Sequence, residues 1–216
     1  MEILAFLLSP IVRAMSWILE CYQGFFASTG LSIILLSWSF SLMLFPFQRW
    51  GSRVEKRISG KIHQIDAEVR PFKKELKGEA LFLETERIYK KYSYHPIYSI
   101  GLGASILVML PVLLSAIVLF SGDGILSGER FWVISDLSKP DGLLGPVNLL
   151  PLLMFAVTSV DAKLRFKDDK RSRYRFYGIS LVLLIIVYDL PAGLVLYWIA
   201  SNIASLLLNR LTLRRA

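Results

Sequence analysis

Residues 190–209 read LPAGLVLYWIASNIASLLLN, a run without a single charged side chain. A helix rises about 1.5 Å per residue, so this run is long enough to cross about 30 Å of hydrocarbon. Residues 29–48 and 96–120 share this length and apolar character. The three stretches predict three membrane-spanning helices, and 54% hydrophobic side chains fit a chain whose solvent is partly lipid.

Two further apolar stretches are weaker. Residues 142–160 lie between Asp141 and Asp161, and Pro146 and Pro151 predict a late helix start. Residues 176–188 end at Asp189 and are short for a span. We interpret both as spans, the second as a short helix in thinned bilayer, because only then do the basic segments share one side of the membrane.

The basic residues give the orientation. Residues 49–91, 163–175 and 210–215 hold nearly all of the 25 Lys and Arg side chains, while Arg13, Arg130 and Lys139 fall elsewhere. The positive-inside rule therefore predicts five spans with the N-terminus outside and the C-terminus in the cytoplasm.

The expected fold is an all-α membrane protein with five transmembrane helices, an N-terminal external amphipathic helix and a cytoplasmic helical hairpin. Polar residues recur on one face of the first segment. In the hairpin, helical spacing is kept by Val54, Ile58, Ile62, Ile65 and Val69 and is roughly resumed by Leu76, Ala80, Leu83 and Ile88. The expected segments are an external interfacial amphipathic helix (1–26), spans (27–48, 96–120, 143–161, 176–189, 190–209), a cytoplasmic hairpin (49–95), an external loop (121–142), a cytoplasmic basic loop (162–175) and a cytoplasmic basic tail (210–216).

Three motifs carry a family resemblance. The stretch from Leu190 to Ile203 closely resembles the last span of YidC/Oxa/Alb-type membrane protein insertases. Residues 89–92 (YKKY) with His95-Pro96 resemble the family's end of the cytoplasmic hairpin, followed by Pro111 inside the second span. Residues 136–141 (DLSKPD) are similar to the external loop before the third span. The matches follow the family's order over nearly the whole chain.

The resemblance implies a hydrophilic groove, enclosed by five spans, that is open to cytoplasm and lipid but closed toward the outside. It implies an insertase or chaperone of the bacterial plasma (inner) membrane that inserts and folds small membrane proteins without nucleotide hydrolysis. Nascent membrane proteins and the lipid bilayer would be its partners, with the ribosome and the Sec translocase as further candidates. Many members place an arginine five residues before the proline that ends the first span; here that position is Ser41.

Two polar stripes are the candidate substrate groove. Each recurs at helical spacing on an otherwise apolar span. The groove residues are Gly30, Ser37, Ser41 and Gln48 on the first span and Trp198, Asn202, Ser205 and Asn209 on the last. The competing interpretation is helix packing, since small and hydroxyl residues often lie between membrane helices.

The cytoplasmic hairpin is the candidate recruitment site. Its basic residues are suited to ribosomal RNA or anionic headgroups, although they could serve orientation alone. They are Arg53, Lys56, Arg57, Lys61, Lys73 and Lys74.

Other function classes lack sequence support. Glycine-rich nucleotide loops, nucleophile motifs and paired cysteines are missing, and His63 and His95 have no second ligand at metal spacing. We therefore expect no enzyme, no metal, no cofactor and no DNA partner. Two alternatives to a general insertase remain: a specialised paralog that assembles one membrane complex, and a small transporter or channel.

Overall fold

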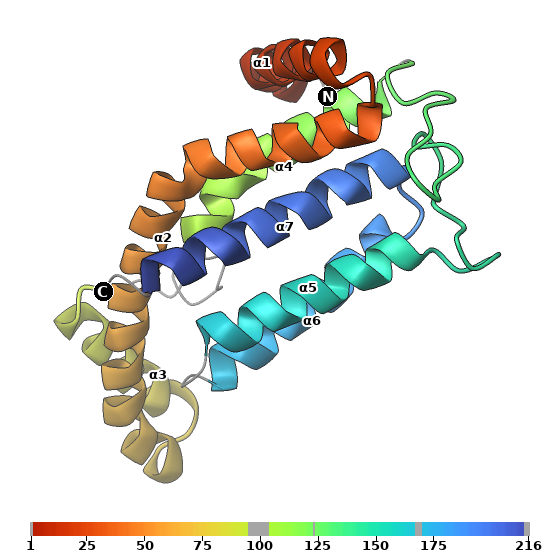
Figure 1. Ribbon diagram of the computed structural model, residues 1–216. Coiled ribbons are helices and arrows are strands. Elements are labelled where there is room, and N and C mark those ends of the chain that lie inside the picture. Colours follow the sequence, from red (N-terminus) through yellow and green to blue (C-terminus); the bar gives the residue numbers. More distant parts are fainter. Residues whose placement is uncertain (1, 95–103, 123, 167–169, 214–216) are drawn as a thin grey trace. The chain divides into compact units, whose positions relative to one another are not determined.

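The computed structural model describes residues 2–94, 104–122, 124–166 and 170–213. Among these residues the regular secondary structure is α-helical, with no β-strand (Figure 1). The helices follow one another along the chain as α1 (Glu2–Phe26), α2 (Thr29–Glu75), α3 (Gly78–Lys91), α4 (Ala104–Ser121), α5 (Leu149–Arg165), α6 (Lys170–Val187) and α7 (Ala192–Leu213). His95, Pro96 and Ala216 lie outside the described residues.

The chain divides into two compact units. Unit 1 comprises Met1–Phe45 and Pro111–Ala216, and unit 2 comprises Pro46–Leu110. Helix α2 contributes its first part to unit 1 and its second part to unit 2.

Two helical stretches of the described residues are long and apolar enough to cross a membrane, Thr29–Gly51 and Ala192–Leu211. A shorter apolar stretch covers Met109–Ser121. Helices α5 and α6 have 17 and 18 residues. Charged side chains lie in the last turns of α5 and in the first turns of α6. The all-helical class is thus observed, whereas the count of five spans stays a prediction.

The core of unit 1 is built from residues far apart in the sequence. Met15 and Leu19 of α1, Leu36 of α2, Leu137 of the α4–α5 loop and Leu194 of α7 are all fully or almost fully buried in one cluster. Helix α1 packs this apolar stripe inward, and the Tyr22 hydroxyl lies 2.8 Å from the Ser39 Oγ of α2. Its other face leaves large apolar side chains uncovered, among them Phe6, Trp17 and Phe25.

Helix α5 contacts both α6 and α7, which lie beside it in Figure 1. The span expected from residue 143 is helical only from Leu149, because residues 141–148 form turns that bring the Asp141 carboxylate to the helix start. Helix α6 begins at Lys170 rather than near 176, so the basic segment supplies its first turns.

Unit 2 contains a helical hairpin formed by the second part of α2 and by α3. Ile65 and Val69 of α2 and Ile88 of α3 are buried together, with Phe72 and Tyr92 packed against them. Pro71 does not end the helix, which continues to Glu75. Leu83, whose spacing matched the inner face, is instead exposed.

Candidate functional site

The predicted groove residues of α2 lie at different levels of this helix, with Gly30, Ser37 and Ser41 in unit 1. Gly30 sits in the first turn of α2, where the Phe131 ring occupies the space that a side chain would need. Ser37 is fully buried and donates its hydroxyl to the carbonyl of Ile34 over 3.0 Å. Ser41 lies three turns from Gly30, a rise of about 16 Å. Gln48 is half-buried and belongs to unit 2.

Ser41 joins α2 to α7. Its Oγ lies 3.1 Å from the Oγ of Ser201, and both residues are buried. Either hydroxyl can donate, so the pair satisfies itself without a charge. The resemblance implies an arginine at the Ser41 position in many family members, whereas in this chain the position takes part in a neutral hydrogen bond between two helices.

Asn202 joins α7 to α5. Its Nδ2 donates to the Thr158 Oγ1 over 3.1 Å, and that hydroxyl in turn donates to the Met154 carbonyl over 2.8 Å. Thr158 therefore uses its acceptor for Asn202 and its proton for its own helix. Asn202 and Thr158 are both half-buried.

We call Ser41, Ser201, Thr158 and Asn202 the polar junction. It connects α2, α7 and α5 by hydroxyl and amide groups, without an ionisable side chain among its four members. Ser201 and Thr158 were not among the predicted groove residues. Ser201 lies beside Asn202 in the quoted motif, and Thr158 with Ser159 interrupts an apolar segment, which is the signal that points to them.

The other predicted residues of α7 have different surroundings. Trp198 is buried in the apolar core cluster of unit 1. Ser205 and Asn209 are half-buried farther along the helix. The structure thus brings Ser41 and Asn202 to one junction and leaves Gly30 and Trp198 in apolar packing.

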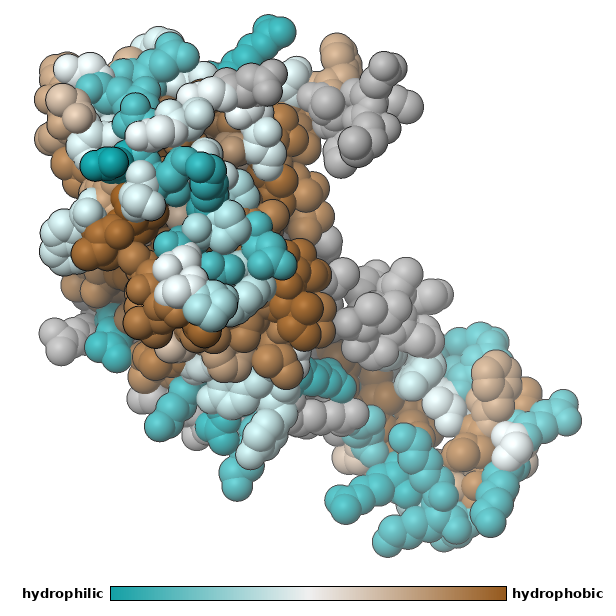
Figure 2. Space-filling model, turned by 90° about the vertical axis from the view of Figure 1, so that its right-hand side faces the viewer, coloured by the Kyte–Doolittle hydropathy of each residue, from teal (hydrophilic) through white to brown (hydrophobic). Residues whose placement is uncertain are grey.

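The loop between α4 and α5 covers the start of α7. The amides of Ala192 and Gly193 donate to the carbonyls of Lys139 and Leu137 over 2.8 and 2.9 Å. Leu126, Ile134 and Leu137 of this loop are buried in the core cluster of unit 1. We call this end, where α2 and α7 begin, the loop end of unit 1; Figure 2 views the molecule from the corresponding side.

Asp141 fixes the first turn of α5 at the same end. Its two carboxylate oxygens accept hydrogen bonds from the amides of Leu149 and Leu150 over 2.8 and 2.9 Å. Negative charge at a helix N-terminus is favourable because the first amides lack helical partners. The Asn148 amide group donates to the Tyr188 carbonyl over 2.8 Å, which ties the end of α6 to this cap.

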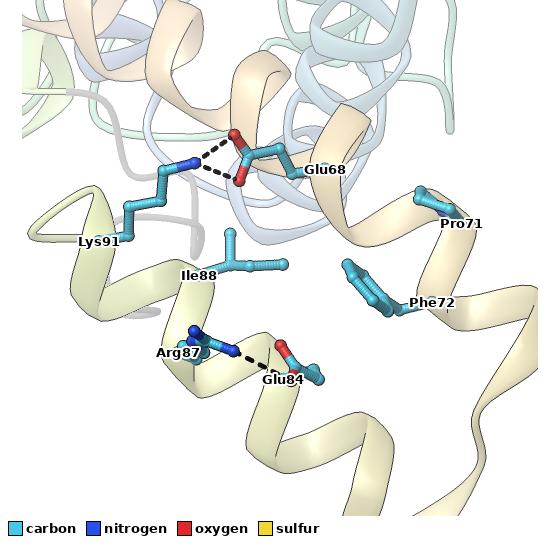
Figure 3. Close-up of a pocket in the computed structure, with 7 residues that line it drawn as sticks. All are labelled: Glu68, Pro71, Phe72, Glu84, Arg87, Ile88 and Lys91. Atoms are coloured by element: carbon cyan, nitrogen blue, oxygen red, sulfur yellow. Dashed lines mark hydrogen bonds and ion pairs between the residues drawn. The ribbon is translucent and has the colours of Figure 1, made fainter.

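The hairpin of unit 2 carries a pocket of about 670 Å³ between α2 and α3 (Figure 3). Glu68 accepts hydrogen bonds from Lys91 over 2.8 Å and from the Tyr92 hydroxyl over 2.6 Å. These hydrogen bonds lower the pKa of Glu68, and Glu68 in turn raises the pKa of Lys91. In the close-up, Ile88 points toward Phe72 across the pocket.

The predicted recruitment residues are spread along the same hairpin. Arg53, Lys61, Lys73 and Lys74 are exposed, whereas the side chains of Lys56 and Arg57 lie outside the described part of the structure. Sequence reasoning missed the Glu68–Lys91–Tyr92 contact, although the YKKY motif contains two of its three members. Within the described residues, no group of three potential metal ligands occurs.

Comparison with known proteins agrees with the motifs. A family model described as 60Kd inner membrane protein matches residues 21–216. Membrane protein insertase YidC of Polynucleobacter asymbioticus is 28% identical over 202 residues, covering 92% of this chain and 34% of that protein. YidC of Treponema denticola is 25% identical over 219 residues, covering 93% and 37%. The chain thus spans about a third of the length of the curated relatives it matches.

A solved structure shares the fold. The crystal structure described as active YidC insertase with the first transmembrane domain resolved matches with a TM-score of 0.59 at 16% sequence identity. The match covers 95% of this chain and 46% of the crystallised one. The helices of the present chain are therefore arranged as in part of that protein.

Proposed function

Because this chain belongs to the 60Kd inner membrane protein family, which includes YidC and Oxa1, we propose that it inserts and folds small membrane proteins without nucleotide hydrolysis. The relatives named above are insertases by description, and the chain covers about a third of each. The observation that carries the proposal beyond the family match is the polar junction between α2, α5 and α7.

An inserting segment must take polar groups partway across hydrocarbon, where each unsatisfied group costs roughly several kcal/mol. The junction offers hydroxyl and amide partners inside an apolar bundle. In the resting protein the junction residues form hydrogen bonds with one another. When a substrate enters, its polar groups would become the new hydrogen-bond partners of these residues. No covalent step is needed, since hydrophobic partitioning of the inserted helix supplies the driving force.

The proposed groove comprises Gly30, Ser37, Ser41, Gln48, Trp198, Asn202, Ser205 and Asn209. Gly30, Ser37, Ser41 and Trp198 are buried in the resting arrangement, so the proposal requires α2 and α7 to separate at the Ser41–Ser201 contact when a substrate enters. The buried loop residues at the loop end fit a groove closed on that side.

A disulfide between α2 and α7 tests this opening. The hydroxyls of Ser41 and Ser201 are close enough for the double variant Ser41→Cys/Ser201→Cys, made with Cys21→Ser, to form one. In proteoliposomes supplied with a translated single-span reporter, the oxidised variant should lose insertion and the reduced variant should recover it. Each single cysteine variant controls for the substitutions. Full insertion by the oxidised form would refute a groove that opens there.

Substrate preference follows from the neutral junction. A buried arginine would attract acidic residues of a translocated tail, whereas Ser41 and Ser201 carry no charge. The proposed substrates therefore have short, weakly charged external tails. Reporters whose tails carry a graded number of acidic residues should insert less as acidity rises. Equal insertion of all tails would contradict this preference.

The proposed topology has five spans, an external N-terminus and a cytoplasmic C-terminus in the bacterial plasma membrane. The hairpin of unit 2, with Arg53, Lys56, Arg57, Lys61, Lys73 and Lys74, would then face the cytoplasm and receive nascent chains. The ribosome and the Sec translocase are proposed partners there. Cysteine accessibility from the two sides of membrane vesicles tests the orientation.

One observation favours a second candidate, a specialised paralog that assembles a single membrane complex. The Ser41–Ser201 pair is neutral, whereas the resemblance implies an arginine at the Ser41 position in many family members, and a neutral pair suits a narrower substrate range. Depletion followed by membrane proteomics distinguishes the two: loss of many small membrane proteins supports the general insertase, and loss of one complex supports the paralog.

A further inference from the structure

A tight turn at the loop end of unit 1 presents two apolar side chains outward. Phe131 and Ile134 exchange both of their backbone hydrogen bonds, over 3.0 and 2.9 Å, which leaves Trp132 and Val133 at the tip. Trp132 has a φ of 53°, a left-handed conformation that bulky residues seldom adopt. The two hydrogen bonds therefore hold the Trp132 backbone in a strained conformation, with the side chains of Trp132 and Val133 at the tip of the turn.

The residues on either side of the tip are anchored. Phe131 packs onto Gly30 in the first turn of α2, and Ile134 is buried in the core of unit 1. Glu129 accepts a hydrogen bond from Thr29 over 2.7 Å, which ties the same loop to the first residue of α2. By contrast, Trp132 is 95% exposed and Val133 is 71% exposed.

The tip lies level with the start of an apolar span. The helical stretch long enough to cross a membrane begins at Thr29, and the turn contacts Thr29 and Gly30 through its own neighbours. Phe25, four residues before the first residue of α2, is also exposed. Headgroups meet hydrocarbon at the level where such a span starts, and Trp is enriched at that boundary because its ring is apolar and its N–H is polar.

We infer that the Trp132–Val133 turn is a lipid anchor, which inserts into the boundary between headgroups and acyl chains beside the first turn of α2. The occupant is the bilayer itself. Anchoring would hold the α4–α5 loop, and through it the start of α7, at a fixed depth. The inference requires α2 to span the membrane, but it does not depend on insertase activity.

Depth-dependent quenching tests the anchor. In the full chain with Cys21→Ser, an environment-sensitive fluorophore is attached at Trp132→Cys or, as a control in the same loop, at the exposed Ser127→Cys. The proteins are reconstituted in vesicles of phosphatidylethanolamine and phosphatidylglycerol. Lipids with a nitroxide near the headgroup should quench the probe at 132 at least threefold more than the probe at 127, and aqueous iodide should show the reverse order.

Equal lipid quenching at the two sites, or stronger iodide quenching at 132, would overturn the anchor and favour a protein partner for the tip. A second readout is the tryptophan emission of the unlabelled variant Trp132→Tyr, in which an aromatic ring stays at position 132. Because Trp132 is almost fully exposed, this variant should fold as the parent does, and its remaining tryptophan emission should show a smaller share quenched by the same lipid. An unchanged share would also count against the anchor.

Discussion

The backbone amide of Gly193 donates to the carbonyl of Leu137 over 2.9 Å, and this hydrogen bond holds the first turn of α7 beneath the α4–α5 loop. The two residues belong to the motifs LPAG and DLSKPD, which are more than fifty positions apart. Their contact gives both motifs one structural role. Each fixes the other at the loop end of unit 1.

Gly193→Ala should destabilise the protein. A Cβ at this position would lie 2.8 Å from a methyl group of Leu126 and 3.3 Å from the Leu137 oxygen, so the buried Leu126 side chain must move and the Leu137 carbonyl must give way slightly. Overpacking of this kind costs about 1–3 kcal/mol. Thermal unfolding in detergent micelles should therefore show a lower midpoint.

Gly178→Ala is the matched control for this substitution. Gly178 lies inside α6, and a Cβ there would meet nothing within 4 Å. Alanine should stabilise that helix by roughly 0.5–1 kcal/mol. A loss of stability at residue 178 that equals the loss at 193 would show that the crowding at Gly193 is not the cause.

The Ser41–Ser201 hydrogen bond should couple α2 to α7 weakly. Hydrogen bonds between membrane helices average about 0.6 kcal/mol in double-mutant cycles. Ser41→Ala, Ser201→Ala and the double variant should give a coupling energy of about this size in unfolding titrations with mixed micelles. Ser180→Ala, which removes a buried hydroxyl that donates to the Phe176 carbonyl of its own helix, should show no coupling with Ser41→Ala. Purely additive losses for the serine pair would contradict the bond.

Much of the helical organisation could be predicted from sequence. Charge-free runs indicate α2 and α7, and the spacing of Ile65 and Val69 indicates the hairpin core that contains Ile88. Leu83 has suitable spacing but is exposed, because α3 is short and only its last turns pack against α2. Periodicity identifies a face, whereas the partner decides how much of that face is covered.

Contacts between distant segments could not be predicted in this way. Nothing local to Asp141 indicates that its carboxylate caps a helix starting eight residues later. Similarly, the serine and asparagine stripes indicate polar faces, but their partners Ser201 and Thr158 emerge only when α2, α5 and α7 are packed. The sequence alone therefore leaves open whether these polar residues line a groove or pack helices together. The two interpretations differ at the polar junction, where the Ser41–Ser201 and Asn202–Thr158 hydrogen bonds would have to open for a groove to form.

The loop that covers α7 should lose stability in acid through Asp136. Hydrogen bonds from the Ser138 side chain and amide, and then the Lys139 ammonium group, lower the pKa of Asp136 from 3.8 to about 2. A carboxylate with a depressed pKa stabilises the folded state above its unfolded pKa, and that contribution disappears as pH falls from about 4 to about 2. Asp136→Asn should remove this part of the pH dependence.

Unfolding midpoints measured between pH 5 and roughly 2 check this prediction. The difference between the parent and Asp136→Asn should be largest at the upper end of the range and should shrink toward the lower end. Asp189→Asn, which changes an exposed carboxylate after α6, serves as the control for a general charge effect. A difference between parent and Asp136→Asn that is constant with pH would contradict the linkage.

Asn202→Leu should slow insertion while lowering the stability of the fold only slightly. Leucine keeps a similar volume but removes the amide that bonds to Thr158, which loses only an acceptor contact because its own proton is already donated to Met154. Stability should therefore fall by about 0.6 kcal/mol or less. If the junction offers hydrogen bonds to an inserting segment, the loss of this bond should raise the insertion barrier by about 0.6 kcal/mol, which corresponds to a rate about threefold lower. Reporter insertion into proteoliposomes measures this rate, and Ile203→Leu on the adjacent exposed position should leave it unchanged. A normal rate for Asn202→Leu would mean that Asn202 packs α7 against α5 and takes no part in insertion.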